Sequence, residues 1–343
     1  MDLFFTFSKE SWNNQFIKLY PEYDIYAPFL FDDHIEYSLL KKTDEIENII
    51  YNKPKPSTPL KTFFLPIKEN VVKKKKEKRK RIIIGMPACD LEALSILDEI
   101  YLDKDYTDPN YLESRKNTIL IGCDCHSIQE HCHCTSYGFN PWPDKNADVV
   151  FSQMNDKVLI EIRSDKGKEF LRKHFAPEKS TSQSDIDELT NLRIDIASEI
   201  RDKNNSLPDY EKTGILINGS EDEIWEKYSD SCVSCGACSA ICPTCSCFLF
   251  TERPEFEKVR SLDTCQYPGF ERVAAGEDPL RSLSTRFRNR YMCKYVWKPE
   301  KFQSKACTGC GRCIEACIGE INKNELFLEL NQKEHLNYDH SRS

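Results

Sequence analysis

The sequence predicts an α+β fold, in which an N-terminal α/β domain over residues 1–215 precedes a largely helical domain over residues 216–332. Short apolar runs alternate with helical periodicity in the first part, whereas most of the 17 cysteines lie in the second. Residues 333–343 are polar and are expected to form a frayed tail. At 343 residues the chain is long enough for two domains, each with its own hydrophobic core.

The N-terminal domain carries the elements of an α/β fold. Residues 82–84 and 118–122 predict buried strands, because each is a short apolar run. Residues 85–87 turn the chain out of the first strand, and Asp90 is in position to cap the helix that follows. Further elements are expected in this order: a hairpin of residues 148–151 and 158–162, a helix at 166–174, a polar loop at 177–184 and a helix at 185–200.

Two runs in the last third of the chain repeat the spacing C-x2-C-x2-C-x3-C. They consist of Cys232, Cys235, Cys238 and Cys242, and of Cys307, Cys310, Cys313 and Cys317. Three cysteines at this spacing converge on one cluster from a tight loop, while the fourth points toward the other cluster. The runs therefore predict two 4Fe–4S clusters joined into one unit. Paired zinc sites are the alternative, although structural zinc usually takes its ligands in C-x2-C pairs.

The spacer between the two runs indicates the kind of domain that holds them. Residues 243–306 separate the runs by 64 positions, far more than a small bacterial ferredoxin uses. The spacer is rich in arginine and aromatic residues, notably over residues 286–291. We expect it to fold as helices packed around the clusters, which makes the second domain an α-helical dicluster ferredoxin domain.

A further group of cysteines lies in the N-terminal domain. Cys89 stands where strand 82–84 leads into a helix, and the backbone N–H groups and dipole there favour a thiolate. Adjacent parallel strands would bring Cys89 to the same sheet edge as Cys125. Cys132 and Cys134 then complete a third 4Fe–4S site.

Two other interpretations of this N-terminal group stay open. One is a zinc site, and the other is a cluster with one histidine ligand; the candidate histidines are His126, His131 and His133. Cys123 faces away from Cys125 if the strand continues, which indicates a core or spare thiol.

Four cysteines of the second domain belong to neither run: Cys245, Cys247, Cys265 and Cys293. They are either small buried residues of the helical domain or the ligands of one more cluster or metal site.

Composition and charge exclude several classes of function. The net charge of −8 disfavours nucleic acid as a partner. The basic run over residues 73–81 is expected to be a solvated loop, with docking to an acidic protein as the alternative. No apolar run reaches the length of a membrane span, and the N-terminus lacks the basic region of a signal peptide. Seventeen cysteines without a secretory signal indicate a reducing compartment, hence the cytoplasm.

The chain also lacks the motifs of a catalytic subunit. It has neither a G-x-G-x-x-G sequence after a strand nor a P-loop, so we expect it to bind neither dinucleotide nor ATP. Nickel-type cysteine pairs and a siroheme signature are missing as well. Splitting a hydride into single electrons therefore requires a flavoprotein partner, and no residue is assigned a catalytic role.

Several stretches resemble a known family. They are PACDLEALSILDEIYLDKDYTDPNY, the spacing Cys125-x6-Cys132-x-Cys134, SCVSCGACSAICPTCSC, DTCQYPGF, RFRNRYMCKY and ACTGCGRC. Together they resemble the iron–sulfur β subunit of cytoplasmic NiFe sulfhydrogenases, and they are also similar to the A subunit of anaerobic sulfite reductase. The resemblance runs from about residue 20 to 320. The CPTCSC and RNRY-x-CK stretches favour the hydrogenase branch.

The resemblance implies three sets of ligands: Cys232, Cys235, Cys238 and Cys317 for one ferredoxin-type cluster; Cys307, Cys310, Cys313 and Cys242 for the other; and Cys89, Cys125, Cys132 and Cys134 for an N-terminal cluster. Two departures from the family are visible. Ile318 stands where proline normally follows the fourth cysteine, and Cys123 is an extra thiol beside the N-terminal set.

The resemblance also implies a function. Such a subunit relays single electrons between a flavin- and NAD(P)H-binding partner and a catalytic subunit of the NiFe or siroheme type, which has its own iron–sulfur protein. Three alternatives remain: the A subunit of an anaerobic sulfite reductase or related redox complex, an enzyme with its own substrate-binding cluster, and a structural or regulatory zinc protein.

Overall fold

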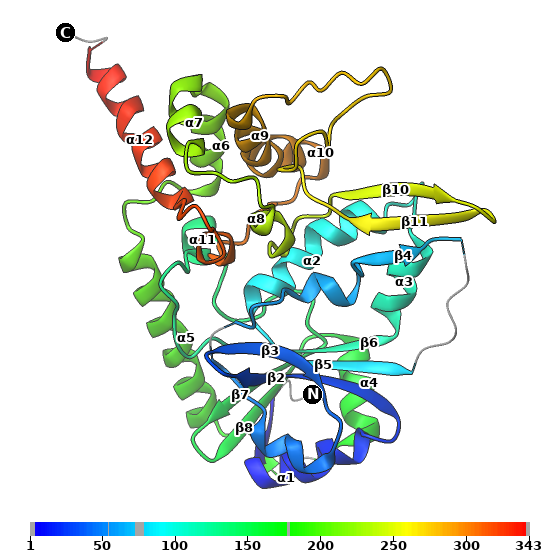
Figure 1. The fold of residues 1–343 in the computed structure, drawn as a ribbon. Coiled ribbons are helices and arrows are strands. Elements are labelled where there is room, and N and C mark those ends of the chain that lie inside the picture. Colours follow the sequence, from blue (N-terminus) through cyan, green and yellow to red (C-terminus); the bar gives the residue numbers. More distant parts are fainter. Residues whose placement is uncertain (1–3, 54, 73–78, 177–178, 341–343) are drawn as a thin grey trace.

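The computed structural model describes residues 4–53, 55–72, 79–176 and 179–340 (Figure 1). A large twisted sheet forms the body of the molecule, and a helical domain with cysteine-rich loops lies beside one edge of it. The basic run predicted as a solvated loop lies, over residues 73–78, outside the described residues. No helix in the described part of the chain is both long and apolar enough to cross a membrane.

The main sheet is mixed. Within the described residues it contains eight strands, in the order β3 (His34–Leu39), β2 (Tyr23–Phe31), β5 (Lys80–Met86), β6 (Thr118–Cys123), β7 (Val149–Met154), β8 (Lys157–Ile162), β1 (Phe4–Ser8) and β9 (Lys179–Ser180). Strands β2, β5, β6 and β7 run parallel, and the remaining pairs are antiparallel. The carboxyl ends of β5 and β6 therefore lie at the same edge, as the sequence predicts for the strands that precede Cys89 and Cys125.

Helices cover both faces of this sheet. On one face, α1 (Lys9–Phe16) and α4 (Asp165–His174) bury an aromatic core in which the Trp12 ring stacks on Phe16 and Phe175, with centroids 5.4 Å and 4.9 Å apart. On the other, α2 (Ala88–Tyr101) buries leucines and α3 (Pro109–Lys116) buries Tyr111 against the strands. Short 3-10 turns connect these elements: η1 (Ile17–Leu19), η2 (Thr43–Asn48), η3 (Leu60–Phe63) and η4 (Cys134–Tyr137).

Most predicted elements of the N-terminal domain are confirmed. Strands β5 and β6 cover the two apolar runs, and β7 pairs antiparallel with β8 as a hairpin. Helix α4 and helix α5 (Gln183–Lys203) occupy the two segments with helical signals. Each begins at a serine, Ser164 or Ser182, whose hydroxyl accepts a hydrogen bond from a backbone N–H in the first turn.

Three expectations were wrong. Asp90 does not cap α2, because Pro87 is the cap residue and the buried Asp90 carboxylate is taken up by Arg312. Part of the segment expected as a polar loop forms β9, since the outer edge of β1 offers backbone hydrogen bonds at Phe5. The expected frayed tail begins as helix, because α12 runs over Lys323–His340.

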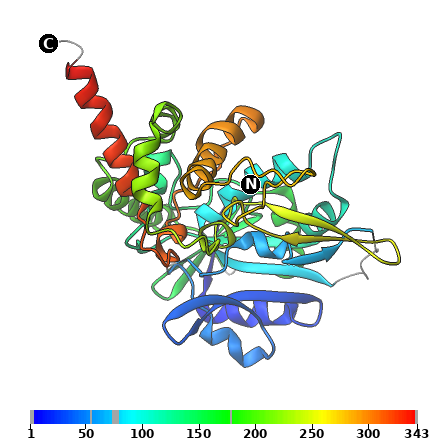
Figure 2. The same cartoon turned by 45° about the horizontal axis from the view of Figure 1, so that its top comes forward.

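The second domain is built around short helices. These are α6 (Tyr210–Gly219), α7 (Asp222–Ser229), α8 (Ala237–Ala240), α9 (Leu283–Met292), the π-helical turn η5 (Cys293–Trp297), α10 (Lys298–Phe302), α11 (Arg312–Glu315) and α12. Trp225, Tyr291 and Phe327 are among the aromatic residues of their shared core. Figure 2 shows α12 projecting away from this domain at the C-terminal end.

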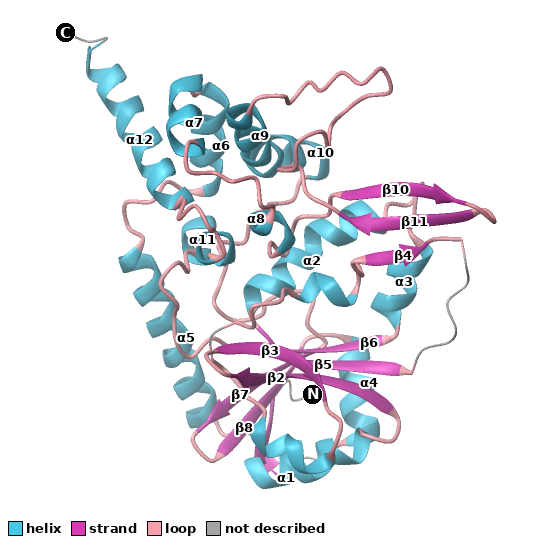
Figure 3. Cartoon of the chain, viewed as in Figure 1, coloured by secondary structure: helices cyan, strands magenta, loops and turns pink. Residues whose placement is uncertain are grey.

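The spacer between the cysteine runs is only partly helical, contrary to expectation. Its first half forms a hairpin of β10 (Phe248–Arg253) and β11 (Glu257–Leu262), and its second half contains α9, η5 and α10. Strand β11 also pairs with β4 (Lys68–Asn70) of the N-terminal domain (Figure 3). Phe248, Phe250, Thr251 and Val259 of the hairpin are residue types that suit strands. The spacer therefore joins the two domains.

A buried ion pair strengthens the same interface. The Arg312 guanidinium, in the second cysteine run, contacts both oxygens of Asp90 at 2.6 Å and 2.9 Å, and it donates to Pro56 O. The two charged side chains are 1% and 0% exposed. A bidentate pair of this kind fixes orientation as well as distance. It anchors the second cysteine run on the first turn of α2, one residue after Cys89.

Replacing Asp90 with Asn should therefore lower the free energy of unfolding by about 3 kcal/mol, because it leaves the buried Arg312 charge without its carboxylate. Denaturant unfolding of the full chain measures this. Glu22→Gln is the control, since Glu22 pairs with Lys173 at the surface with both side chains more than half exposed, and its loss should cost under about 1 kcal/mol. Equal effects of the two substitutions would contradict the anchoring role.

Candidate metal centres

The two cysteine runs adopt the same local conformation. In each, a glycine between the second and third cysteine caps a one-turn helix: Gly236 precedes α8 with φ +73°, and Gly311 precedes α11 with φ +77°. A positive φ reverses the chain without the steric cost that a Cβ would bring. At Gly311 a Cβ would also lie 2.6 Å from the carbonyl oxygen of His131. The second run is thus packed directly on the loop that carries the N-terminal cysteines.

Two neighbouring cavities lie between the runs. The first cavity is lined by three cysteines of the first run together with the last two cysteines of the second run: Cys232, Cys235, Cys238, Cys313 and Cys317. The second cavity is lined by three cysteines of the second run together with the last cysteine of the first run: Cys307, Cys310, Cys313 and Cys242. The structure therefore brings together each of the two fourfold sets that the resemblance implies, with the fourth cysteine exchanged between the runs.

The two cavities share part of their walls. Cys313, Arg290 and Lys323 line both. The described residues contain no set of three His, Cys, Asp or Glu side chains gathered tightly enough for a single metal ion. The thiols instead surround space, which is the arrangement that a multi-iron cluster needs.

The cavity thiols are suited to a metal by their surroundings. Burial raises the pKa of Cys310 to about 12 and that of Cys238 to about 11. At neutral pH such thiols lose their protons only when a metal takes the proton's place. Backbone donors are also present, because Ile321 N–H donates to Cys317 Sγ at 3.3 Å. Such N–H···S contacts stabilise negative charge on the ligand sulfur.

Buried cations surround the same sulfurs. The Lys294 ammonium donates to Cys242 Sγ at 3.0 Å, to Thr244 Oγ1 at 2.6 Å and to Ala306 O at 3.0 Å. Burial alone would lower the pKa of Lys294, but the thiolates of Cys242 and Cys245 outweigh it and raise this pKa well above its usual value.

Two more basic side chains are buried beside the cavities, although burial lowers the pKa of Lys323, against the opposing effect of the Cys307 and Cys313 thiols. Arg290 is 3% exposed and donates to Cys238 O at 3.0 Å. Lys323 is also 3% exposed and contacts His133 Nε2 at 2.8 Å. Among the described residues, no carboxylate forms an ion pair with Arg290, Lys294 or Lys323. The negative charge that stabilises them must therefore come from the thiolates, and a site for anionic iron–sulfur clusters fits these cavities.

The N-terminal cysteines gather beside the second cavity. Burial raises the pKa of Cys125 well above its usual range, and the nearby thiols of Cys134 and Cys132 add to this rise. Burial likewise raises the pKa of Cys89, with further contributions from Asp90 and Cys310. Cys125 packs against Cys134, and Cys89, Cys132 and Cys310 lie near enough for their charges to act on the pKa values of this group.

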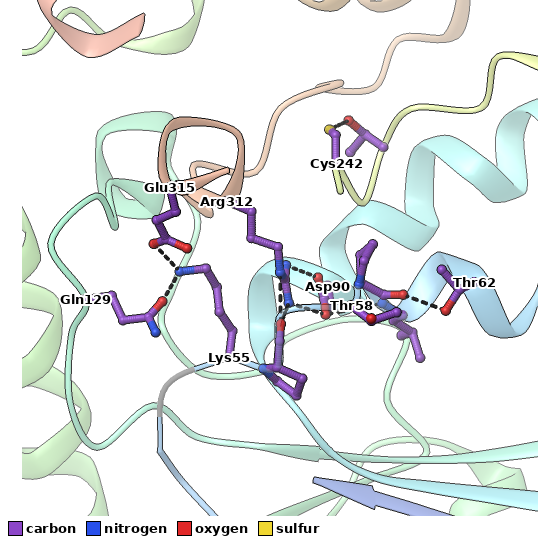
Figure 4. A network of polar contacts seen from close by, with 12 residues as sticks. Lys55, Thr58, Thr62, Asp90, Gln129, Cys242, Arg312 and Glu315 are labelled. Carbon is purple, nitrogen blue, oxygen red and sulfur yellow. Dashed lines mark hydrogen bonds and ion pairs between the residues drawn. The ribbon is translucent and has the colours of Figure 1, made fainter. Parts of the chain in front are cut away.

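A buried lysine accompanies this group too. Figure 4 shows the Lys55 ammonium between Gln129 and Glu315, beside the Arg312–Asp90 pair. The Lys55–Glu315 contact is 2.9 Å long and links the N-terminal domain to α11. Burial lowers the pKa of Lys55, but the Cys132 thiolate and Glu315 outweigh burial and raise it overall.

One of the three candidate histidines, His133, is poorly placed as a ligand. Both ring nitrogens of His133 are occupied, since Nδ1 contacts His131 O at 2.7 Å and Nε2 contacts Lys323. Burial and the Lys323 charge hold the pKa of His133 well below its usual value, so the ring is neutral. Cys123, the extra thiol, lies on β6 within the apolar core and away from this group.

Comparison with known proteins agrees with this geometry. Residues 231–321 match the family described as a 4Fe-4S dicluster domain. The chain is also 28% identical to sulfhydrogenase 2 subunit beta of Pyrococcus furiosus, over 346 aligned residues that cover 93% of this chain and 99% of the relative. This chain is a sulfhydrogenase beta subunit homologue. This chain has a mixed α/β N-terminal region and a 4Fe–4S dicluster domain, which confirms the predicted fold class. The dicluster domain implies two 4Fe–4S clusters.

The buried cations beside the two cavities were not predicted from the sequence. Lys294 and Arg290 lie in the stretch RFRNRYMCKY, in which every basic residue looks alike. Only the packing of α9 and η5 over the cavities distinguishes them from the exposed lysines nearby. Helical spacing offered one usable signal, because Arg290 and Lys294 are four residues apart and so share a helix face.

Replacing Lys294 with Met should lower the reduction potential of a cluster bound in the second cavity by about 60 mV. The variant removes a charged hydrogen bond that stabilises the electron-rich state, and 59 mV corresponds to a tenfold change for one electron. A potentiometric titration followed by electron paramagnetic resonance (EPR) measures the shift. Lys301→Met is the matched control, because Lys301 is exposed on α10. An unshifted potential in the Lys294 variant would contradict the role given to its ammonium.

Proposed function

We propose that this chain is an electron-transfer subunit, which relays single electrons through 4Fe–4S clusters within a sulfhydrogenase-type complex. The observation that carries the proposal is the exchange of the fourth cysteine between two adjoining cavities that share Cys313. Each cluster, when bound, accepts or donates one electron. The protein's own part is to hold the thiolates at fixed separation, to supply buried positive charge and to exclude water.

In this proposal Cys232, Cys235, Cys238 and Cys317 hold the cluster of the first cavity, and Cys307, Cys310, Cys313 and Cys242 hold that of the second. A third 4Fe–4S cluster is held by Cys89, Cys125, Cys132 and Cys134. Its support is the contact of Gly309 with the backbone of His133 and Cys134, where His133 N–H donates to Gly309 O at 2.9 Å. The three sites thus form a continuous row, with Cys310 between the N-terminal site and the second cavity.

The partners follow from what a one-electron relay needs at its two ends. We propose that one end meets a flavin- and NAD(P)H-binding subunit, which converts a hydride into single electrons. The other end meets a catalytic subunit of the NiFe type with its own iron–sulfur protein, in keeping with the sulfhydrogenase relative. No residue of this chain is assigned a catalytic role. Because iron-bound thiolates need a reducing compartment, we place the relay in the cytoplasm.

Replacing Cys310 with Ala should remove about four iron atoms per chain and interrupt electron flow from reduced flavoprotein to the catalytic subunit, since the second cavity loses a ligand. Iron analysis and the rate of electron transfer in the assembled complex measure the two effects. Cys123→Ala is the control, because Cys123 is a buried thiol that lies in the apolar core and outside both cavities. Undiminished electron flow in the Cys310 variant would refute the assignment.

Replacing Cys134 with Ser tests the N-terminal site separately. The variant should lose about four iron atoms while the EPR signals of the two ferredoxin-type clusters persist, because η4 lies outside the two cavities. A His126→Ala variant, which the proposal expects to retain its iron, serves as the control. If Cys134→Ser retains all its iron, or if zinc is the metal lost, the third cluster is disproved.

A further inference from the structure

Three cysteines that the relay does not use meet at the base of the β10–β11 hairpin. Cys245 and Cys247 lead into β10, and Cys265 follows β11 after two residues. The base is closed by a hydrogen bond in which Asp263 N–H donates to Cys247 O at 3.0 Å. The hairpin therefore places Cys265 beside two cysteines that are about twenty residues away in sequence.

The thiols of this group lie against one another and against the second cavity. The Cys247 thiol contacts that of Cys265, and the Cys245 thiol contacts that of Cys242. Gln266 Nε2 donates to Cys265 Sγ at 3.5 Å, as a donor to a ligand sulfur would. Cys242 lines the second cavity, so the group adjoins the relay at that point.

An open pocket gives this group access to solvent. Cys245 and Cys247 line the pocket together with Lys61, Ser239, Asp263 and Tyr267, which come from both domains. Neither cavity of the dicluster domain contains Cys247 or Cys265. The pocket is therefore separate from the two cavities; Cys245 and Cys247 line it, and the buried Cys265 contacts Cys247.

Positive charge surrounds these thiols as it does in the cavities. The Lys61 ammonium is 3% exposed, and it donates to Ser239 O at 3.1 Å and Cys245 O at 3.0 Å. Lys298 Nζ donates to Thr244 O at 3.1 Å. Within the described residues neither lysine forms an ion pair with a carboxylate. Lysines beside the pocket favour an anion in it.

We propose that Cys245, Cys247 and Cys265 hold an additional iron–sulfur cluster, whose fourth coordination position faces the pocket and accepts a small sulfur anion, such as a thiolate or sulfide. Three thiolates are too few for structural zinc, which is closed by four protein ligands. Soft sulfur ligands select iron–sulfur clusters. The site extends the proposed relay to the surface at the junction of the two domains, and its three cysteines are distinct from the ligands assigned to the other clusters.

Iron, acid-labile sulfide and EPR spectra of the full chain test this site. Cys247→Ser and Cys265→Ser should each lose about four iron atoms per chain while the ferredoxin-type signals persist. Cys293→Ser, which changes the remaining unassigned cysteine, should keep all its iron. Unchanged iron in Cys247→Ser, or a Cys247–Cys265 disulfide in the anaerobically purified protein by mass spectrometry, would overturn the proposal. The ferredoxin-type EPR signals of Cys310→Ala test the proposed relay alone. Their loss would not affect the assignment of the site formed by Cys245, Cys247 and Cys265.

A second measurement avoids reliance on how well the variants fold. Ethanethiolate added to the wild-type chain should shift the EPR spectrum of one cluster, because only a cluster with an open coordination position binds it. The same addition should leave the spectrum of Cys247→Ser unchanged. If ethanethiolate leaves the wild-type spectrum unchanged, the open position does not exist and the proposal fails.

Discussion

Buried positive charge is the constraint on which the rest of the structure depends. Arg290, Lys294 and Lys323 are each at most 4% exposed, and in the described part of the chain none has a carboxylate partner. An uncompensated buried cation costs several kcal/mol, so the fold is stable only if negative charge lies beside it. The surrounding thiols provide that charge once iron has displaced their protons. The cations and the clusters therefore stabilise one another.

Buried charge also joins the two domains to each other. The Arg312–Asp90 pair and the Lys55–Glu315 pair each connect the second cysteine run to the N-terminal domain. Strand β11 adds backbone hydrogen bonds to β4. Electron transfer needs fixed distances between clusters, and an interface held by buried charges and a shared sheet resists domain motion better than a polar interface would. The N-terminal site and the second cavity are thus held in one rigid arrangement.

Local patterns in the sequence predicted strands β5–β8 and helices α4 and α5, because apolar runs and helical periodicity are visible without knowledge of distant partners. They failed where a distant partner decides the structure. Asp90 was expected to cap a helix, but its carboxylate pairs with Arg312, which is 222 residues away in sequence. The hairpin in the spacer was missed because the exposed strand β10 lacks polar alternation: Phe248, Leu249 and Phe250 are consecutive. Lys294 carries no motif, since its role comes only from the packing of η5 over the second cavity.

The most direct test of the account is the metal content of the wild-type full chain, purified without oxygen. Iron, acid-labile sulfide and zinc are measured on the same sample, together with the EPR spectrum after reduction. The account predicts equal amounts of iron and sulfide, at least about eight of each per chain, and only traces of zinc. Stoichiometric zinc without labile sulfide would contradict it, because the cysteine sets would then hold zinc and the chain would contain no iron–sulfur cluster to carry electrons.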